Sequence, residues 1–377
     1  MNFRPTPLAH ALTVALAWAV FLGIALGRPE PFLLAVPFIA ALLHGAASRP
    51  HSAVQATVSV DRQQAAEGET LVRVIAAQII APAGPVQVLA VPPPLLRWRD
   101  PLPALVLPPP DGALVWHQHL TCAGSGVFEL GRLGFRVWDR TGLWVGEQVV
   151  TQPAGVTVLP RALPVRHPPL PRRTGPLLGA HPSPVTGDGL AFAEVGRFLP
   201  GDRPRSINWP VSLRRQSLYA NRFHPDRQAD VVLLIDTFAV IGERPDSSLD
   251  HVLRAAAGLA AACLARHDRV GVVEYGGIVR SVRLSSGPLH ARRLLAALAR
   301  AAPIRTELLQ DLRRLPEAVL PRRAMVVALT PLADARVARA LAGLAERGQD
   351  VVALVLDTER LSLRLLRRAV RGAKPRA

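Results

Sequence analysis

The sequence has very little cysteine, and Cys122 and Cys263 are its only two residues of this type. Two cysteines in different predicted domains are too few for a disulfide framework, so a reducing compartment is the simpler interpretation. Lysine is scarcer still, because Lys374 is the only one and arginine supplies almost all of the positive charge. A small, disulfide-rich secreted fold is therefore excluded.

Acidic residues are also few: 28 aspartates and glutamates stand against 45 lysines and arginines, which gives a formal net charge of +17. This balance favours anionic surfaces such as phospholipid headgroups or nucleic acid. The arginines are dispersed, however, and no motif of stacking aromatic residues accompanies them, so we expect no nucleic-acid partner. Membrane lipid remains as the expected anionic partner.

Sequence motifs for catalysis are missing as well. The chain contains no Gly-x-Ser-x-Gly elbow, no Walker loop, no HExxH motif and no paired-carboxylate motif. A hydrolase therefore stays an alternative without a motif to support it. We expect a protein that is not an enzyme.

Long apolar runs, in contrast, are present at the N-terminus. Residues 9–27 carry no charge, and at about 1.5 Å per residue they would span roughly 28 Å of hydrocarbon. A second apolar run at residues 31–47 follows after a short loop, which predicts a transmembrane helical hairpin within residues 1–50. A cleaved signal peptide beginning at Arg4 is the alternative, and the second run argues against it.

The arginines that flank the hairpin indicate its orientation. Arg4, Arg49 and Arg62 lie outside the two apolar runs, and Arg28 lies in the loop between them. By the positive-inside rule, both ends of the hairpin face the cytoplasm. We expect a multi-pass cell-membrane protein with two helices and cytoplasmic soluble domains.

Residues 51–160 change to short alternating runs separated by Gly, Pro and Asp, which predicts an all-β, sandwich-like domain. Strands are expected at residues 53–60, 70–80, 85–91, 113–122, 127–138 and 145–152. His117 and His119 resemble metal ligands, but in a strand Cys122 points to the opposite face, so a zinc site is disfavoured. Residues 161–189, rich in proline and arginine, are typical of an extended linker.

Beyond residue 230 the chain alternates between strands and helices. A continuous apolar strand at residues 231–235 precedes a capping-box pattern from Ser247 to Asp250, and a hairpin is expected at Gly276-Gly277. Buried parallel strands connected by helices predict a doubly wound α/β domain over residues 231–377, with its sites at the carboxyl ends of the strands. The basic tail from residue 360 is interpreted as a helix docked on the sheet or, alternatively, on a membrane surface.

The segment of residues 190–230 holds the most distinctive motif, GDRPRSINWPVSLRR. Its spacing, GD-x-x-R-x-I-x-W, resembles the signature of the domain of unknown function 58 family, at Gly201, Asp202, Arg205, Ile207 and Trp209. A D-x-x-GLW turn of the kind found in that family ends the β domain, at Asp139, Gly142, Leu143 and Trp144.

This resemblance implies a fold and a setting. Members of the family typically carry a helical hairpin, a β domain, the signature and a von Willebrand factor A-like domain. The resemblance also implies a bacterial membrane protein that is often paired with a MoxR-type AAA+ ATPase. The role it implies is the assembly or maturation of other proteins or of the cell envelope.

The resemblance to A-like domains also implies a magnesium site, which would need D-x-S-x-S after the first strand, a loop threonine and a later aspartate. Here Asp236 is kept, but Phe238 and Val240 replace the two serines. Thr306 matches the loop threonine, and Asp334 is the nearest candidate for the last ligand. We expect a degenerate site without a cofactor, and magnesium held through waters is the alternative.

The signature itself has two interpretations. In the first, Gly201 and Asp202 form a turn, Arg205 pairs with Asp202 and Trp209 packs into the α/β domain. In the second, arginines present a recognition surface to an acidic partner or to anionic lipid; these are Arg203, Arg205, Arg214 and Arg215. The function expected is a noncatalytic scaffold or adaptor that engages the ATPase, with a magnesium-dependent partner-binding domain as the alternative.

Overall fold

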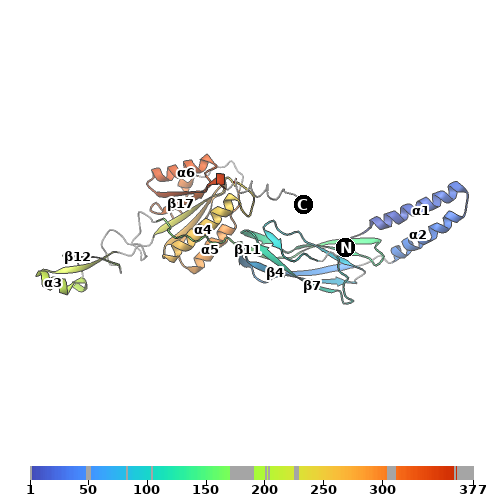
Figure 1. The fold of residues 1–377 in the computed structure, drawn as a ribbon, viewed down its shortest axis with the longest axis horizontal. Coiled ribbons are helices and arrows are strands. Elements are labelled where there is room, and N and C mark those ends of the chain that lie inside the picture. Colours follow the sequence, from blue (N-terminus) through green and yellow to red (C-terminus); the bar gives the residue numbers. More distant parts are fainter. Residues whose placement is uncertain are drawn as a thin grey trace, which may run out of the picture. The chain divides into compact units, whose positions relative to one another are not determined.

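The computed structural model describes residues 2–47, 52–81, 84–102, 105–169, 191–199, 202, 204–224, 229–303, 311–360 and 362. The chain divides into two compact units: unit 1 comprises Met1–Ala123 and Val127–Val158, and unit 2 comprises Gly124–Gly126 and Leu159–Ala377. Most of the predicted linker and of the basic tail lies outside the described residues. Figure 1 shows the elements of both units.

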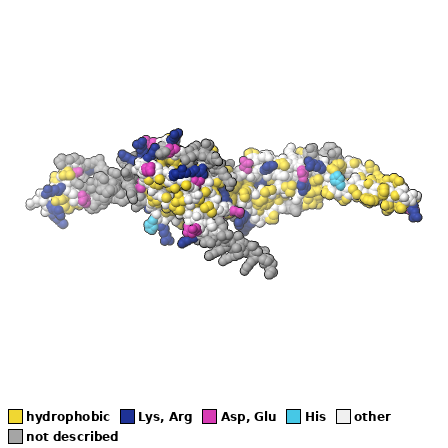
Figure 2. Space-filling view, turned by 90° about the horizontal axis from the view of Figure 1, so that it is seen from above, with side chains coloured by type: hydrophobic (Ala, Val, Ile, Leu, Met, Phe, Trp, Pro, Cys, Tyr) yellow, Lys and Arg dark blue, Asp and Glu magenta, His cyan; other side chains and the backbone are white. Residues whose placement is uncertain are grey.

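Two apolar helices open unit 1: α1 (Pro7–Leu26) and α2 (Glu30–Ala47). Thr6 caps the first turn of α1, and Gly27 ends this helix in the left-handed conformation. The helices approach closely, because a Cβ atom on Gly23 would lie 2.6 Å from the Phe32 ring. Both are long and apolar enough to cross a membrane, and hydrophobic side chains cover them in Figure 2.

The rest of unit 1 consists of strands in three sheets, and the two larger sheets are antiparallel. One four-stranded sheet runs in the order β1 (Asn2–Pro5), β10 (Trp144–Thr151), β9 (Arg132–Trp138) and β5 (Val86–Leu89). A second runs in the order β2 (Ala53–Val60), β4 (Thr70–Ile80), β7 (Ala113–Cys122) and β6 (Leu96–Trp98). A three-stranded sheet contains β3 (Gln64–Ala66), β11 (Gly155–Leu159) and β8 (Gly126–Glu129).

Alternating residues of the two four-stranded sheets form one apolar core. Ile75 on β4 and Phe135 on β9 are both fully buried in it. The expected strands at 53–60, 70–80 and 113–122 are confirmed residue for residue. The expected strand at 127–138 is in fact two strands, because the chain bends at Gly131, where a Cβ atom would lie 1.6 Å from the Gln152 carbonyl oxygen.

An arginine lies in this apolar interior. Arg73 on β4 is 3% exposed, and its Nε and Nη2 atoms have no hydrogen-bond partner. Its Nη1 atom donates a hydrogen bond to Gln118 Oε1 at 3.3 Å, and this acceptor is a neutral amide. Burial lowers the pKa of Arg73 to about 10, which means that the buried positive charge reduces the stability of the folded state.

Replacing Arg73 by methionine is therefore expected to raise the free energy of unfolding of unit 1 by about 1–3 kcal/mol at neutral pH. The folded pKa lies below the unfolded one, so the cost of the charge is present at neutral pH and fades as the pH rises through about 10. Denaturant unfolding of the full chain in detergent measures the change. Arg97→Met, at an exposed position of β6, is the control and should change stability by less than about 0.5 kcal/mol. A loss of stability in Arg73→Met would show that the charge is compensated.

A five-stranded sheet forms the centre of unit 2. Its order is β16 (Arg280–Ser285), β15 (Arg269–Tyr275), β14 (Asp230–Asp236), β17 (Met325–Thr330) and β18 (Asp350–Val355). Neighbouring strands are parallel except for β16, which pairs antiparallel with β15 as the expected hairpin. The strands β14 and β17 are buried along their length, as their continuous apolar sequences predict.

Helices cover both faces of this sheet (Figure 1). On one face, α4 (Ser248–Ala265) and α5 (Pro288–Ala299) pack on Leu233 and Val327. On the other, α6 (Ala335–Glu346) and the short helix η2 (Leu312–Arg314) pack on Leu234 and Val326. The capping box at the start of α4 is confirmed. Although α4 is apolar enough to cross a membrane by composition, it is largely buried against the sheet.

The family signature lies in a small lobe of unit 2. Strands β12 (Ala191–Arg197) and β13 (Tyr219–His224) pair with each other, and between them lie η1 (Pro204–Ser206) and α3 (Trp209–Arg215). Asn208 caps α3 by accepting from Val211 N at 3.2 Å, and its Nδ2 atom donates to Asn221 Oδ1 at 2.7 Å. The signature therefore folds back onto β13. We call residues 191–224 the signature lobe.

Candidate functional site

Parallel strands β14 and β17 end side by side, and we call this end of the sheet the carboxyl edge. Asp236 is the last residue of β14 and is 1% exposed, and Thr330 is the fully buried last residue of β17. Thr330 Oγ1 donates to Asp236 Oδ2 at 2.5 Å, and the Phe238 amide donates to Asp236 Oδ1 at 3.0 Å. Burial raises the pKa of Asp236, and these two hydrogen bonds oppose the shift.

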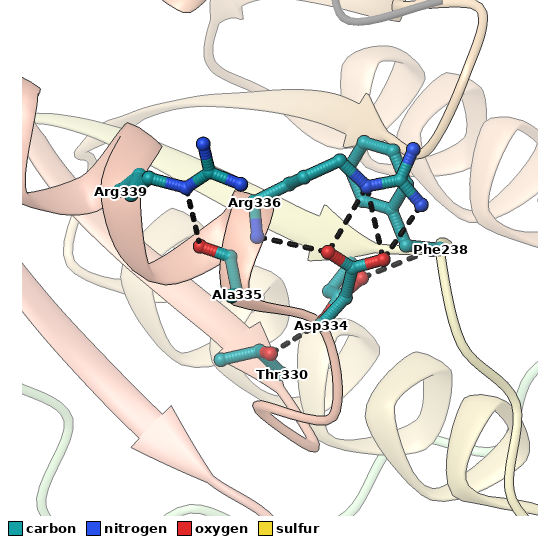
Figure 3. Close-up of polar contacts among 7 residues, drawn as sticks. Phe238, Thr330, Asp334, Ala335, Arg336 and Arg339 are labelled. Carbon is teal, nitrogen blue, oxygen red and sulfur yellow. Dashed lines mark hydrogen bonds and ion pairs between the residues drawn. The ribbon is translucent and has the colours of Figure 1, made fainter. Parts of the chain in front are cut away.

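Next to Asp236, an arginine and an aromatic ring occupy the carboxyl edge (Figure 3). Asp334, the N-cap residue of α6, accepts from Arg336 Nη2 at 2.6 Å and from Arg336 Nε at 3.0 Å. The guanidinium carbon of Arg336 lies 4.2 Å from the centre of the Phe238 ring. Arg336 holds the pKa of Asp334 below its usual range.

The loop after β14 is fixed against β15. Thr237 N donates to the Tyr275 carbonyl at 3.0 Å, and the Phe238 and Tyr275 rings meet edge to face at 5.0 Å. Gly276 has to be glycine, because a Cβ atom there would lie 1.8 Å from Thr237 Oγ1. Phe238 is thus held between Tyr275 and Arg336, where a metal-binding loop would need a hydroxyl group.

These residues do not fit a magnesium ion. Both oxygens of Asp236 already accept hydrogen bonds from the protein, and both oxygens of Asp334 contact Arg336. Thr306, the third predicted ligand, lies outside the described residues. Within the part of the chain that the structure describes, no group of three His, Cys, Asp or Glu side chains is placed to hold a metal.

The structure brings two of the three predicted metal ligands to one edge, because Asp236 ends β14 and Asp334 lies in the loop after the parallel neighbour β17. The sequence interpretation missed Thr330 and Arg336, whose side chains bind the carboxylates of Asp236 and Asp334 at this edge. Thr330 had a usable signal: it ends the apolar strand at 325–330, and parallel neighbours end at the same edge. Arg336 had none, because a cation–π contact depends on the path of the loop before α6.

The signature residues have a different arrangement from the one predicted. Asp202 does form a turn, accepting from Leu199 N at 2.8 Å, while Gly201 and Arg203 lie outside the described residues. The predicted pair between Arg205 and Asp202 is wrong, because among the described ion pairs none joins them and Asp202 is used by its own turn. Ile207 makes an isolated bridge to Ala220 on β13.

The prediction that Trp209 packs into the α/β domain is also wrong. Its side chain is 60% exposed. The reason is local: α3 is held to β13 through backbone and hydroxyl contacts, such as Ser212 Oγ accepting from Tyr219 N at 2.8 Å. These short contacts leave the Trp209 ring and Leu213, one helical turn later, at the surface. Arg214, the last predicted signature residue, is exposed as well.

The D-x-x-GLW turn, residues 139–144, joins the two apolar helices to the β strands, and we call it the clamp turn. Thr6, just before α1, donates from its Oγ1 to the Gly142 carbonyl at 2.7 Å and from its N to the Leu143 carbonyl at 2.9 Å. Trp144 Nε1 donates to the Gly45 carbonyl of α2 at 2.8 Å. One turn therefore holds the ends of both helices.

Strand β1 continues this connection by pairing with β10 in front of α1. A signal peptidase cut after α1 would remove this edge strand and Thr6 with it, which argues against the signal-peptide alternative. Since both helix ends contact the clamp turn, they also lie on the same side of any membrane that the helices cross. Asp139 organises the turn, because its buried carboxylate accepts from Trp144 N at 2.9 Å and from Thr141.

Two helices apolar enough to cross a membrane, a β unit clamped to them and an α/β unit with a distinctive lobe define the class of this protein. Residues 194–364 match the family model described as "Protein of unknown function DUF58". The match covers part of strand β12, the rest of the signature lobe and most of the five-stranded sheet with its helices, so this part of the chain is similar to that family.

Individual relatives are distant. The protein is 26% identical over 107 residues to "Uncharacterized protein YeaD" of Bacillus subtilis (strain 168), which covers 28% of this chain and 25% of YeaD. The match thus spans a quarter of that relative's length. Among solved structures, the adhesin FdeC of Escherichia coli aligns with 47% of this chain and 58% of its own at 14% identity, with a TM-score of 0.16. That score is too low to support an argument on fold or function.

Proposed function

We propose that this protein is a membrane-anchored, noncatalytic scaffold or adaptor that engages a MoxR-type AAA+ ATPase. Its soluble units then lie in the cytoplasm and serve the assembly or maturation of other proteins or of the cell envelope. In this proposal unit 2 acts as a von Willebrand factor A-like domain, and the β sheets of unit 1 act as a sandwich-like spacer next to the membrane.

The observation that carries the proposal is the closed carboxyl edge. In doubly wound sheets the ligand lies at this edge, yet here each oxygen of the buried Asp236 carboxylate already accepts a hydrogen bond, one from Thr330 and one from Phe238. What the edge offers is the Arg336 guanidinium on the Phe238 ring, and Leu332 in the loop before α6 is exposed. An arginine, an aromatic ring and an exposed aliphatic side chain favour contact with a protein over catalysis.

The backbone near this surface supports the same interpretation. Leu332 has a φ of 49°, an unfavourable left-handed conformation for a leucine. Its amide donates to Thr330 Oγ1 at 2.8 Å, so the same threonine that binds Asp236 also holds the loop. Backbone strain of this kind costs about 1–3 kcal/mol and concentrates at functional surfaces.

The test is a pull-down of the tagged full chain from native membranes in the presence of ATP and magnesium. We expect an AAA+ ATPase to be recovered, and we expect Arg336→Glu to reduce its recovery at least tenfold, the effect of losing about 1.4 kcal/mol. Arg292→Glu, at an exposed position of α5, changes the charge equally and should leave recovery unchanged. Reproducible absence of any AAA+ ATPase would refute the proposal.

The competing magnesium-dependent interpretation has its own readout. Titration calorimetry of the full chain with magnesium chloride is expected to give no saturable heat, because the oxygens of Asp236 and Asp334 are already engaged. Micromolar binding that disappears in Asp236→Asn would contradict the closed-edge interpretation.

A further inference from the structure

We propose that the signature lobe binds the anionic headgroups of a phospholipid bilayer, with Trp209 and Leu213 entering the membrane interface. This docking surface gives the chain a second membrane contact besides its helical hairpin. The inference does not rest on the ATPase partner, and its test gives a separate answer.

Few side chains of the lobe are buried where the structure describes their burial. Among residues 194–199, 202 and 204–221, Ser212 and Ala220 are the buried ones. Among the described residues its two strands form a sheet of their own, extended only by the isolated bridge from Ile207 to Ala220, and a two-stranded sheet is marginal in water. Large apolar side chains are nevertheless exposed on it: Trp209 is 60% exposed and Leu213 is 77% exposed. These features indicate that the face with Trp209 and Leu213 binds another molecule or a membrane.

The signature lobe is positively charged, which favours an anionic binding partner. Residues 191–224 contain six arginines and two acidic residues, a difference of +4. One of the two acids, Asp202, is used by its own turn. Arg205 and Arg214 are exposed and make no ion pair among the described residues. Figure 2 shows basic and hydrophobic side chains together on this lobe, at the left of the view.

One arginine is also held in place for contact. Arg215 lies with its guanidinium carbon 5.2 Å from the centre of the Tyr219 ring, and its Nη1 donates to the Tyr219 hydroxyl at 3.4 Å. This hydrogen bond lowers the pKa of Tyr219. The aromatic ring thus fixes a cation at the end of the same short helix that carries the exposed Trp209 and Leu213.

A bilayer fits this combination better than an acidic protein does. Tryptophan is favoured at the membrane–water interface, and arginine binds lipid phosphates while neighbouring aliphatic side chains enter the acyl boundary. Each basic residue near an anionic leaflet contributes about 1 kcal/mol to attraction. The clamp turn ties the soluble chain to the ends of both apolar helices, so a bilayer spanned by those helices is always present at high effective concentration.

The experiment uses the full chain in lipid nanodiscs, with the variant Ser217→Cys carrying an environment-sensitive fluorophore. Ser217 is exposed just after α3, so Trp209 and Leu213 are kept. The native thiols do not compete for the label: Cys122 and Cys263 are buried, and burial raises the pKa of each to about 11. We expect a shift of the emission to shorter wavelength in discs of equal parts phosphatidylcholine and phosphatidylglycerol, compared with pure phosphatidylcholine.

Charge variants decide the origin of the shift. Arg205→Glu combined with Arg214→Glu should abolish it, whereas Arg292→Glu combined with Arg293→Glu, the same charge change on exposed positions of α5, should not. Raising the ionic strength from about 0.1 M to about 1 M shortens the Debye length from about 10 Å to about 3 Å and should also remove it. Melting curves of all variants confirm that the lobe variants are folded.

Two results would overturn the proposal. The first is an emission maximum that is equal in anionic and neutral discs. The second is a shift that appears only when an acidic polypeptide is added, in either kind of disc, which would assign the lobe to a protein partner. Neither result bears on recovery of the ATPase, so the two proposals fail independently.

Discussion

Replacing Asp139 by alanine is expected to release the two apolar helices from the β strands of unit 1. The Asp139 carboxylate is 2% exposed and accepts hydrogen bonds from Trp144 N and from Thr141. Its loss removes the acceptor of these partly buried donors, which costs about 2–4 kcal/mol for this set of bonds. The clamp turn then loses the shape that presents the Gly142 carbonyl to Thr6. Hydrogen exchange of the full chain in detergent should show faster exchange at the amides of Thr6 and Trp144.

The matched control is Glu129→Ala, which removes a carboxylate from an exposed position of β8 and should change neither exchange nor stability. The same clamp can be opened from the helix side. A Cβ atom on Gly45 would lie 2.3 Å from Leu143 Cδ1, so Gly45→Ala should displace this buried leucine and accelerate exchange at the same amides. Unchanged exchange in both variants would mean that the turn does not hold the helices.

Replacing Asp236 by alanine is expected to destabilise unit 2 by about 2–4 kcal/mol, because the Thr330 hydroxyl and the Phe238 amide lose their buried acceptor. The loop that carries Phe238 should then detach from Arg336, and the surface proposed for the ATPase should be lost with it. Denaturant unfolding followed by near-ultraviolet circular dichroism measures the change. Asp334→Ala is the comparison, and removing this helix N-cap should cost only about 1 kcal/mol.

The raised pKa of Asp236 predicts a pH dependence with a definite sign. Above its usual pKa near 3.8, the folded protein holds the proton more tightly than the unfolded chain, so stability falls as the pH rises through this range. The asparagine side chain in Asp236→Asn does not titrate, so this variant lacks that contribution to the pH dependence. The free energy of unfolding of the wild type relative to Asp236→Asn should therefore increase as the pH is lowered toward 3.8.

Taking the difference between these two proteins removes the contribution of Glu274, another buried carboxyl group with a raised pKa. A difference that stays constant across this pH range would show that Asp236 is not desolvated. A difference with the opposite slope would show that a cation near Asp236, rather than burial, sets its pKa.

These two sites have separate roles in the proposed function. The clamp turn fixes the β strands to the ends of the helices through Thr6 and Gly45. The carboxyl edge offers a surface on unit 2 that is built from Phe238 and Arg336. A scaffold needs both an anchor and a surface for its partner. The two substitutions should therefore separate loss of anchoring from loss of partner recovery.

Local patterns in the sequence were sufficient for much of the fold. Alternation of apolar residues predicted the long strands of unit 1, and the capping box predicted the start of α4. Two apolar runs predicted α1 and α2 to within a few residues. These features depend on neighbours a few residues apart, so the chain itself carries the signal. The short strands β1, β3 and β6 were missed, because three or four residues hold too little periodicity.

By itself, the sequence determined that this chain has two apolar spans, an alternating β region, an α/β region and the GD-x-x-R-x-I-x-W motif. It also determined that the two serines of a metal-binding loop are missing after Asp236. Only the tertiary structure decided what the named residues touch. Asp236 meets Thr330 across 94 positions of chain, and Trp144 meets Gly45 across 99. Such contacts depend on how strands align and loops close, and no local pattern encodes them. For the same reason the sequence was misleading about Trp209. Its size and apolar character suggested a place in a core, but it lies at the surface of the signature lobe.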